Sequence, residues 1–150
     1  TAAIVGDGPL RDRIEPEAAA ADVELLGRRS DVPDLLREST VMAMTSAADT
    51  EGMPGVLIEA ALSGIPAVST LAAGVADVVI DGRTGRTVTD TAEAVADGVA
   101  EFLTSTSHGE SVGAHARERA LKLFTIRANA EAWRALVAKV GAPRGPRSRS

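Results

Sequence analysis

Short apolar runs alternate with helical patterns along the chain up to Asp90. We interpret the apolar runs as strands, because parallel strands that are buried on both faces are continuously apolar. The expected strands cover residues 2–5, 23–26, 41–45, 67–69 and 85–88. The expected helices cover residues 9–20, 32–38, 54–62 and 91–103. This alternation predicts an α/β protein with a parallel sheet.

Prolines and glycines indicate where several of these elements begin and end. Pro9 and Pro54 stand at expected first helical positions, where a missing N–H costs nothing. Pro16 lies inside the first helical pattern and predicts a break or kink there. The segment DGRTG at residues 81–85 predicts a reverse turn that leads into the last strand.

After Asp90 three helical patterns follow without strands, over residues 91–103, 108–123 and 126–140. The last of these has one apolar face, formed by Ala130, Trp133, Leu136, Val137 and Val140. We expect residues 1–140 to form one domain. Residues 141–150 contain only Gly, Ala, Pro, Arg and Ser, which predicts a disordered basic tail.

Composition excludes several classes of protein. The chain of 150 residues has 45% hydrophobic and 25% charged residues, an ordinary globular balance. It has no cysteine, which excludes disulfides, thiolate metal sites and cysteine nucleophiles. A net charge of −5 and 2% aromatic residues argue against nucleic-acid binding. With no visible signal peptide and no apolar run near the ~20 residues of a membrane span, we expect a cytoplasmic protein with at most peripheral membrane contact.

The most informative stretch runs from Glu51 to Glu59. These two carboxylates are eight positions apart and bracket an expected strand-to-helix turn that contains two glycines and Pro54. Open parallel sheets bind ligands at this edge, and a helix N-terminus offers free N–H groups to an anion. The pair suits a hydroxyl-rich ligand that carries phosphate. Alternatively, Glu51 favours the helix dipole and Glu59 is a surface residue; the local pattern leaves both interpretations open.

Two further turns carry glycine or arginine. After the first strand, Gly6 and Gly8 begin a dinucleotide fingerprint, but Arg11 replaces its third glycine, so a tight turn explains this segment better. After the second strand, the backbone around Arg28 and Arg29 could read a nucleobase edge, or the segment simply caps the next helix.

The remaining candidate residues carry weaker signals. Gly74, after the fourth strand, predicts a turn or a close approach of backbone. The two histidines, His108 and His115, are expected on a surface helix and lie far in sequence from the carboxylates. We find no metal-ligand cluster and no nucleophile triad in the sequence.

Together these segments follow one another in an order and at spacings that resemble a known family. They are AIVGDGPL at 3–10, LG at 26–27, DVPDLL at 31–36, Ser46, EGMP at 51–54, EA at 59–60, GIPAVS at 64–69, Gly74 and DGRTG at 81–85. The set is similar to the C-terminal half of the retaining group 1 glycosyltransferases, which use nucleotide-diphospho-sugars. The resemblance runs from about residue 2 to residue 103.

The resemblance implies a Rossmann-like, doubly wound parallel sheet that binds the sugar donor, facing a second such domain that binds the acceptor. It implies that Glu59 hydrogen-bonds the ribose, and that Glu51 with the backbone of Gly52 and Met53 holds the transferred sugar. Gly6 is a candidate loop contact.

The resemblance also assigns the diphosphate to the amides of Gly55, Val56 and Leu57, and the base to the backbone of Arg28 and Arg29. It implies retention of anomeric configuration without a metal or other cofactor, since helix N–H groups and basic side chains can replace Mg²⁺. The acceptor stays open: a sugar, a lipid-linked sugar or a small molecule. The implied role is carbohydrate biosynthesis.

Three features depart from the family pattern. Pro54 replaces a glycine of many members, and Asp77 replaces a usual glutamate. The chain also begins inside an expected strand, without the preceding strand and helix that carry an Arg and a Lys for the diphosphate, and without the acceptor domain. We therefore expect a fragment that is inactive alone, whose sheet closes by direct pairing, recruits a strand from another copy, or belongs to a larger protein.

Two other functions remain open at this stage. One is a nucleotide-sugar epimerase or phosphorylase of the same architecture, whose catalytic groups are not found in this chain. The other is a non-catalytic nucleotide-binding or interaction module in which the two carboxylates are structural.

Overall fold

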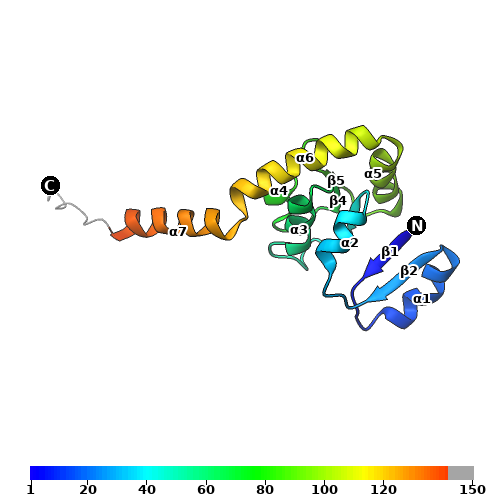
Figure 1. Ribbon diagram of the computed structural model, residues 1–150. Helices are drawn as coiled ribbons and strands as arrows, with labels where there is room; N and C mark the ends of the chain where they lie inside the picture. Colours follow the sequence, from blue (N-terminus) through cyan, green and yellow to red (C-terminus); the bar gives the residue numbers. More distant parts are fainter. Residues whose placement is uncertain (142–150) are drawn as a thin grey trace. The chain divides into compact units, whose positions relative to one another are not determined.

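The computed structural model describes residues 1–141 (Figure 1). It divides into two compact units, Thr1–Leu35 and a second unit that begins at Leu36. The described strands form two sheets, each with parallel strands: β1-β2 in the first unit and β3-β4-β5 in the second. Closure of these five strands into one sheet is therefore not observed, whereas the α/β class with parallel strands is confirmed.

The first unit is a βαβ segment of β1 (Ala2–Val5), α1 (Arg11–Ala20) and β2 (Val23–Gly27). Ala2 pairs with Val23, and a shift of register after Ile4 places Val5 opposite Gly27. The interpretation of 2–5 as a buried strand is wrong, since every residue of β1 is exposed. One helix and two strands contain too little chain to cover both faces of a sheet.

The second unit is built around a three-stranded sheet. Helix α2 (Val32–Glu38) leads into this unit. The elements that follow it are β3 (Met42–Met44), α3 (Gly55–Ser63), β4 (Ala67–Thr70), α4 (Val75–Val78), β5 (Arg86–Val88), α5 (Ala92–Thr104), α6 (Thr106–Leu123) and α7 (Ile126–Gly141). The central strand is β4, and all four of its residues are buried. The short helix α4 is absent from the sequence-based prediction because four residues give no helical period.

Alternating residues of β4 divide the core into two layers. Ala67 belongs to a cluster with Leu57 of α3 and Val75 of α4. Its neighbour Val68 belongs to a cluster with Phe102 of α5 and Val112 of α6. Successive strand residues point to opposite faces, so α3 and α4 cover one face of the sheet and α5 covers the other.

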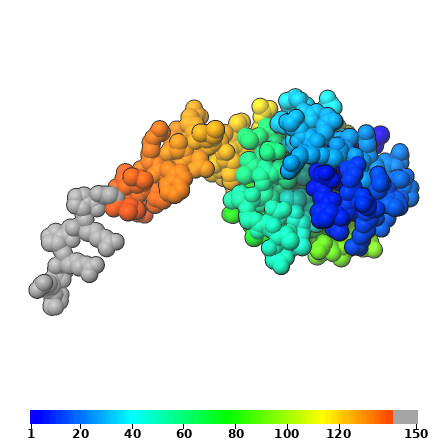
Figure 2. Space-filling model, turned by 90° about the horizontal axis from the view of Figure 1, so that it is seen from below, coloured from blue at the N-terminus to red at the C-terminus, as the bar shows by residue number. Residues whose placement is uncertain are grey.

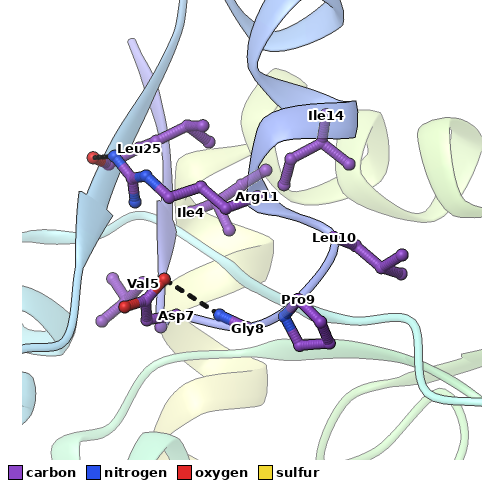
Figure 3. A pocket seen from close by; sticks show the side chains of 10 residues that line it. Ile4, Val5, Asp7, Gly8, Pro9, Leu10, Arg11, Ile14 and Leu25 are labelled. Carbon is purple, nitrogen blue, oxygen red and sulfur yellow. Dashed lines mark hydrogen bonds between the residues drawn. The ribbon is translucent and has the colours of Figure 1, made fainter.

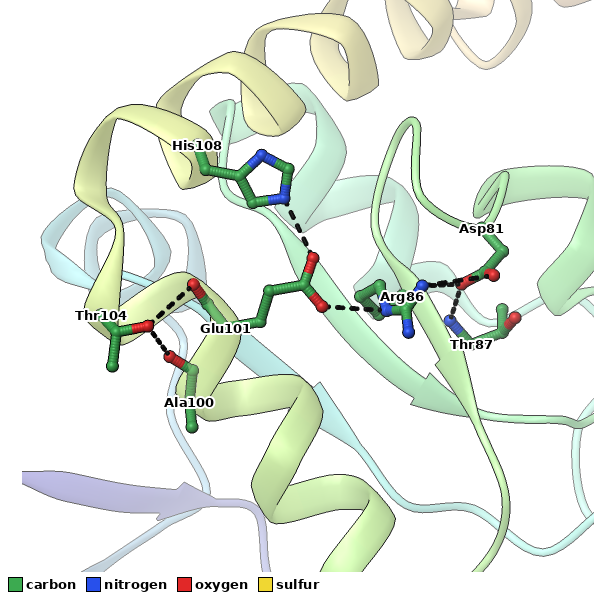
Figure 4. Close-up of polar contacts among 7 residues, drawn as sticks. All are labelled: Asp81, Arg86, Thr87, Ala100, Glu101, Thr104 and His108. Carbon is green, nitrogen blue, oxygen red and sulfur yellow. Dashed lines mark hydrogen bonds and ion pairs between the residues drawn. The ribbon is translucent and has the colours of Figure 1, made fainter.

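Polar contacts join the edge strand β5 to α5 and α6 (Figure 4). Glu101 of α5 pairs with Arg86 Nε at 3.0 Å and with His108 Nε2 of α6 at 3.0 Å. Asp81 accepts a hydrogen bond from the Thr87 N–H at 2.9 Å. The Gly82 N–H donates to the Gly85 carbonyl at 2.9 Å, which confirms the reverse turn at 81–85.

Two helix starts and one predicted break differ from expectation. Helix α1 begins at Arg11 rather than Pro9, and α3 begins at Gly55 with Pro54 as an extended N-cap at φ −72° and ψ 103°. Proline's fixed φ fits the N-cap as well as the first helical position, so the sequence does not distinguish them. The predicted break at Pro16 is wrong: α1 continues as one helix through Pro16, although this residue has no N–H to donate.

The last helix, α7, is exposed along most of its length. Trp133 is 62% exposed and Val137 is 63% exposed. In the space-filling view its orange side chains are largely uncovered (Figure 2). None of the helices within residues 1–141 combines the length and hydropathy that a membrane span requires. Of the basic tail predicted over residues 141–150, Gly141 ends α7 and residues 142–150 lie outside the described part. The single domain over 1–140 stays a prediction.

Candidate functional site

The carboxyl ends of β3 and β4 lie next to each other, because these strands are parallel neighbours with Met44 opposite Ser69. The loops that follow them are joined by hydrogen bonds. The Thr70 hydroxyl donates to the Ser46 carbonyl at 2.7 Å, and the Ala73 N–H donates to the Ala48 carbonyl at 3.4 Å. Thr70 is 1% exposed, so this anchor lies within the core.

Gly74 brings the two loops into direct backbone contact. Its φ of +72° is in the left-handed region, and a Cβ at this position would lie 2.0 Å from the Gly52 carbonyl oxygen. No residue with a side chain fits that space, which confirms the close approach predicted for Gly74. The loop after β4 therefore packs directly against the backbone of the 51–53 turn.

Glu51 is half-buried in this turn, where its direction is set by a serine. The Ser46 hydroxyl donates to Glu51 Oε1 at 2.8 Å. The chain of contacts thus runs from buried Thr70 through the backbone and side chain of Ser46 to the carboxylate of Glu51. A carboxylate accepts up to about four hydrogen bonds, so Glu51 keeps acceptor capacity for a ligand.

The N-terminus of α3 lies directly after this turn. No side chain within residues 1–141 caps it, and the Leu57 N–H donates to the Pro54 carbonyl at 3.2 Å. The amides of Gly55 and Val56 come earlier in the helix, where no intrahelical acceptor exists. A Cβ at Gly52 or Gly55 would meet nothing within 4 Å, so the backbone here faces open space.

Glu59 lies four residues after Gly55, on the same face of α3, and is exposed. Helical side chains are directed toward the N-terminus, so we expect its carboxylate to extend toward the open amides. Met53 is 51% exposed at the turn, whereas the Leu57 side chain is 1% exposed and belongs to the core. One segment therefore places two carboxylates beside a free helix N-terminus.

The first unit holds the other predicted site residues. Gly6 has φ +133°, and its N–H donates to the Gly27 carbonyl at 2.8 Å. The Arg29 side chain forms two hydrogen bonds to Asp31, at 2.8 and 2.5 Å. This pairing lowers the pKa of Asp31 and raises that of Arg29. Because the Arg29 side chain is engaged with Asp31, a role in base binding would fall to the backbone.

A cavity of about 350 Å³ opens in the first unit between β1, α1 and β2 (Figure 3). Arg11 lies across it, with Nη2 donating to the Leu25 carbonyl at 3.4 Å. Asp7 Oδ1 accepts from the Gly8 N–H at 3.0 Å. The position of the third glycine in a dinucleotide fingerprint is thus filled by Arg11, whose guanidinium reaches from α1 to β2.

Thr70, whose hydroxyl anchors Ser46, was not among the residues predicted from the sequence. Its only signal is the polar pair Ser69 and Thr70 at the end of an otherwise apolar strand, both of which are buried. The two histidines lie on α6, as expected. Within residues 1–141 no group of three or more His, Cys, Asp or Glu side chains is placed to hold a metal ion; metal independence stays a prediction.

Comparison with known proteins gives consistent matches. A family model described as "Glycosyl transferases group 1" matches residues 1–105. N-acetyl-alpha-D-glucosaminyl L-malate synthase of Bacillus anthracis is 32% identical over 127 residues, 81% of this chain and 32% of that protein. 2-Deoxystreptamine N-acetyl-D-glucosaminyltransferase of Niallia circulans is 30% identical over 129 residues, again 81% of this chain and 32% of that protein.

The solved structures agree with the Rossmann-like fold. The crystal structure of Anabaena Alr3699/HepE in complex with UDP-glucose matches with a TM-score of 0.81 and 26% identity. The match covers 92% of this chain and 41% of that chain. The present chain thus spans about a third of the length of the two relatives named above and 41% of that solved chain. With the family model covering residues 1–105, this chain belongs to the group 1 glycosyltransferases.

Proposed function

We propose that this chain is the donor-binding half of a retaining glycosyltransferase that transfers a sugar from a nucleotide-diphospho-sugar to an acceptor. The observation that carries the proposal is the open N-terminus of α3 between Glu51 and Glu59. Its free amides suit an anion and its two carboxylates suit hydroxyl groups. The 26% identical Alr3699/HepE, solved with UDP-glucose, supports this ligand class.

The transferred sugar binds at the 51–53 turn in this proposal. Glu51 accepts hydrogen bonds from sugar hydroxyls in the orientation that Ser46 sets. The backbone of Gly52 and the exposed Met53 form the rest of this subsite, where Gly52 offers open space in place of a side chain. A rigid turn limits the entropy lost when the sugar binds.

The diphosphate binds at the start of α3. The amides of Gly55 and Val56 donate to phosphate oxygens, and the positive end of the helix dipole favours their charge. The Leu57 amide contributes less than the other two, because it already donates to the Pro54 carbonyl. Donors aimed at a leaving diphosphate stabilise the charge that develops in the transition state, which is the basis for proposing metal-independent transfer.

Glu59 binds the ribose by accepting hydrogen bonds from its two vicinal hydroxyls, from a position one turn beyond the phosphate amides. The backbone of Arg28 and Arg29 reads the base, and Gly6 supplies a loop contact; these three residues lie in the first unit. We further propose that transfer retains the anomeric configuration, occurs in the cytoplasm, and uses a second domain that binds the acceptor.

Isothermal titration calorimetry of the chain with UDP, GDP and ADP tests this proposal. We expect one of them to bind, and Glu59→Ala to weaken it about tenfold through loss of charge-assisted hydrogen bonds. Glu110→Ala, a change at an exposed glutamate near the start of α6, is the matched control and should leave the affinity unchanged. Failure of all three nucleotides to bind the folded full-length protein would favour an interaction module instead.

A further inference from the structure

A second polar cleft lies in the second unit, between the turn after α4 and one face of α6. Its volume is about 220 Å³. Arg83 and Thr84 line it from the turn, and His115, Glu118, Arg119 and Lys122 line it from α6. The four α6 residues recur at three-and-four spacing, so they share one face of the helix.

The charge of this cleft differs in sign from that of the protein. Arg83, Arg119 and Lys122 are cationic and Glu118 alone is anionic, whereas the whole chain carries a net charge of −5. The Lys122 ammonium pairs with Glu118 Oε1 at 2.5 Å. That contact, with smaller effects from His115 and Arg83, lowers the pKa of Glu118. Two guanidinium groups are left without a carboxylate partner among the lining residues.

Arg119 is held in place by the backbone. Its Nη2 donates to the Asp77 carbonyl at 2.9 Å, across 42 residues of sequence. Its Nε is fully buried and has no hydrogen-bond partner within residues 1–141. The bond to the Asp77 carbonyl therefore fixes the Arg119 guanidinium where it lines the cleft.

The turn that carries Arg83 is also rigid. The Thr84 hydroxyl accepts from the Ile80 N–H at 2.8 Å, and Thr84 is 4% exposed. The N–H groups of Arg83 and Thr84 both donate to the Ile80 carbonyl at 2.9 Å. Cations on a fixed turn and a fixed helix face need little reorganisation to bind an anion, which lowers the entropic cost of binding.

We propose that this cleft binds a small phosphate-bearing anion. Guanidinium groups match the geometry of phosphate oxygens, and a lysine ammonium adds a point charge. The cleft is smaller than the about 300–1,000 Å³ of pockets that enclose drug-sized ligands, so it suits inorganic phosphate or the phosphate group of a small ester. Its residues are separate from the 51–59 segment, so the inference does not rest on the proposed donor site.

Nuclear magnetic resonance of the isotope-labelled chain during titration with inorganic phosphate tests the proposal residue by residue. We expect saturable shifts at Arg83, His115 and Lys122, with chloride as the control for ionic strength. A parallel titration with glucose 6-phosphate distinguishes the two sources: tighter binding than phosphate indicates an ester, and weaker binding indicates the free ion. Absence of saturable shifts in the cleft with both compounds would overturn the proposal.

Variants sharpen the test. Arg83→Gln should weaken phosphate binding about threefold to tenfold, as expected for a partly exposed charge-assisted contact. Glu118→Gln should strengthen it, because it removes the carboxylate that competes for the cations. Lys139→Gln on exposed α7 is the matched control and should change nothing. Unchanged affinity in both Arg83→Gln and Glu118→Gln would show that the anion binds elsewhere, and circular dichroism confirms that each variant is folded.

Discussion

Gly74→Ala should both destabilise the protein and weaken nucleotide binding, although residue 74 is not assigned a contact with the nucleotide. An alanine at φ +72° costs about 1–2 kcal/mol in backbone strain. Its Cβ would lie 2.0 Å from the Gly52 carbonyl oxygen, against a practical minimum of 3.0 Å, so that oxygen must move by at least 1.0 Å. Overpacking of this kind adds about 1–3 kcal/mol.

Gly82→Ala is the matched control. Gly82 has a similar φ of +69°, but a Cβ there would meet nothing within 4 Å. It should lose only the backbone contribution of about 1–2 kcal/mol, so Gly74→Ala should be less stable than Gly82→Ala by about 1–3 kcal/mol. Urea denaturation of both variants measures this difference in the free energy of unfolding.

The effect on binding follows from the same displacement. A shift of about 1 Å in the 51–53 turn misplaces the sugar subsite and the start of α3, and misplacements of this size can cost about two orders of magnitude in function. Calorimetry with the nucleotide that binds the unmodified chain should show a loss of at least about tenfold for Gly74→Ala and none for Gly82→Ala. Equal stability and equal affinity of the two variants would refute the reasoning.

Three further variants test separate contacts. Ser46→Ala should weaken binding of the nucleotide-sugar more than that of the nucleoside diphosphate, because it frees the Glu51 carboxylate that orients the sugar; calorimetry with both ligands checks this. Glu118→Gln should reduce the loss of stability at acid pH. The pKa of Glu118 is lowered in the folded protein, so its carboxylate stabilises the fold above the unfolded pKa of 4.5, and this contribution is lost as the pH falls through the folded pKa. Urea denaturation from pH 7 to pH 3 measures the change in the free energy of unfolding. Gly113→Ala should lower the melting temperature, because its Cβ would lie 2.0 Å from a backbone carbonyl oxygen, whereas Gly109→Ala on the same helix meets its nearest neighbour at 3.6 Å and should be neutral or stabilising.

Local pattern predicted the elements that position the site. The strand before Ser46 and the helix after Pro54 both exist, with Glu51 in the turn between them and Glu59 on the helix. These features depend on apolar runs and on glycine and proline, which act within a few residues. The exact helix start did not follow from the sequence, because proline at φ −72° fits both the N-cap and the first helical position.

Features that depend on distant residues could not be predicted in the same way. The anchor between Thr70 and Ser46 spans 24 positions and depends on the parallel pairing of β3 and β4. The exposure of β1 and the division of the strands into two sheets depend on which segments pack together, which apolar content alone does not specify. The hydrogen bond between Ser46 and Glu51 was missed although both residues were singled out.

The most direct test of the donor-site assignment is the location of a bound nucleoside diphosphate. Backbone amide resonances of the isotope-labelled chain, followed during titration with UDP, report each N–H separately. We expect the largest shifts at Gly55 and Val56, the amides of the open start of α3. Saturable binding with both of these amides unchanged would contradict the assignment.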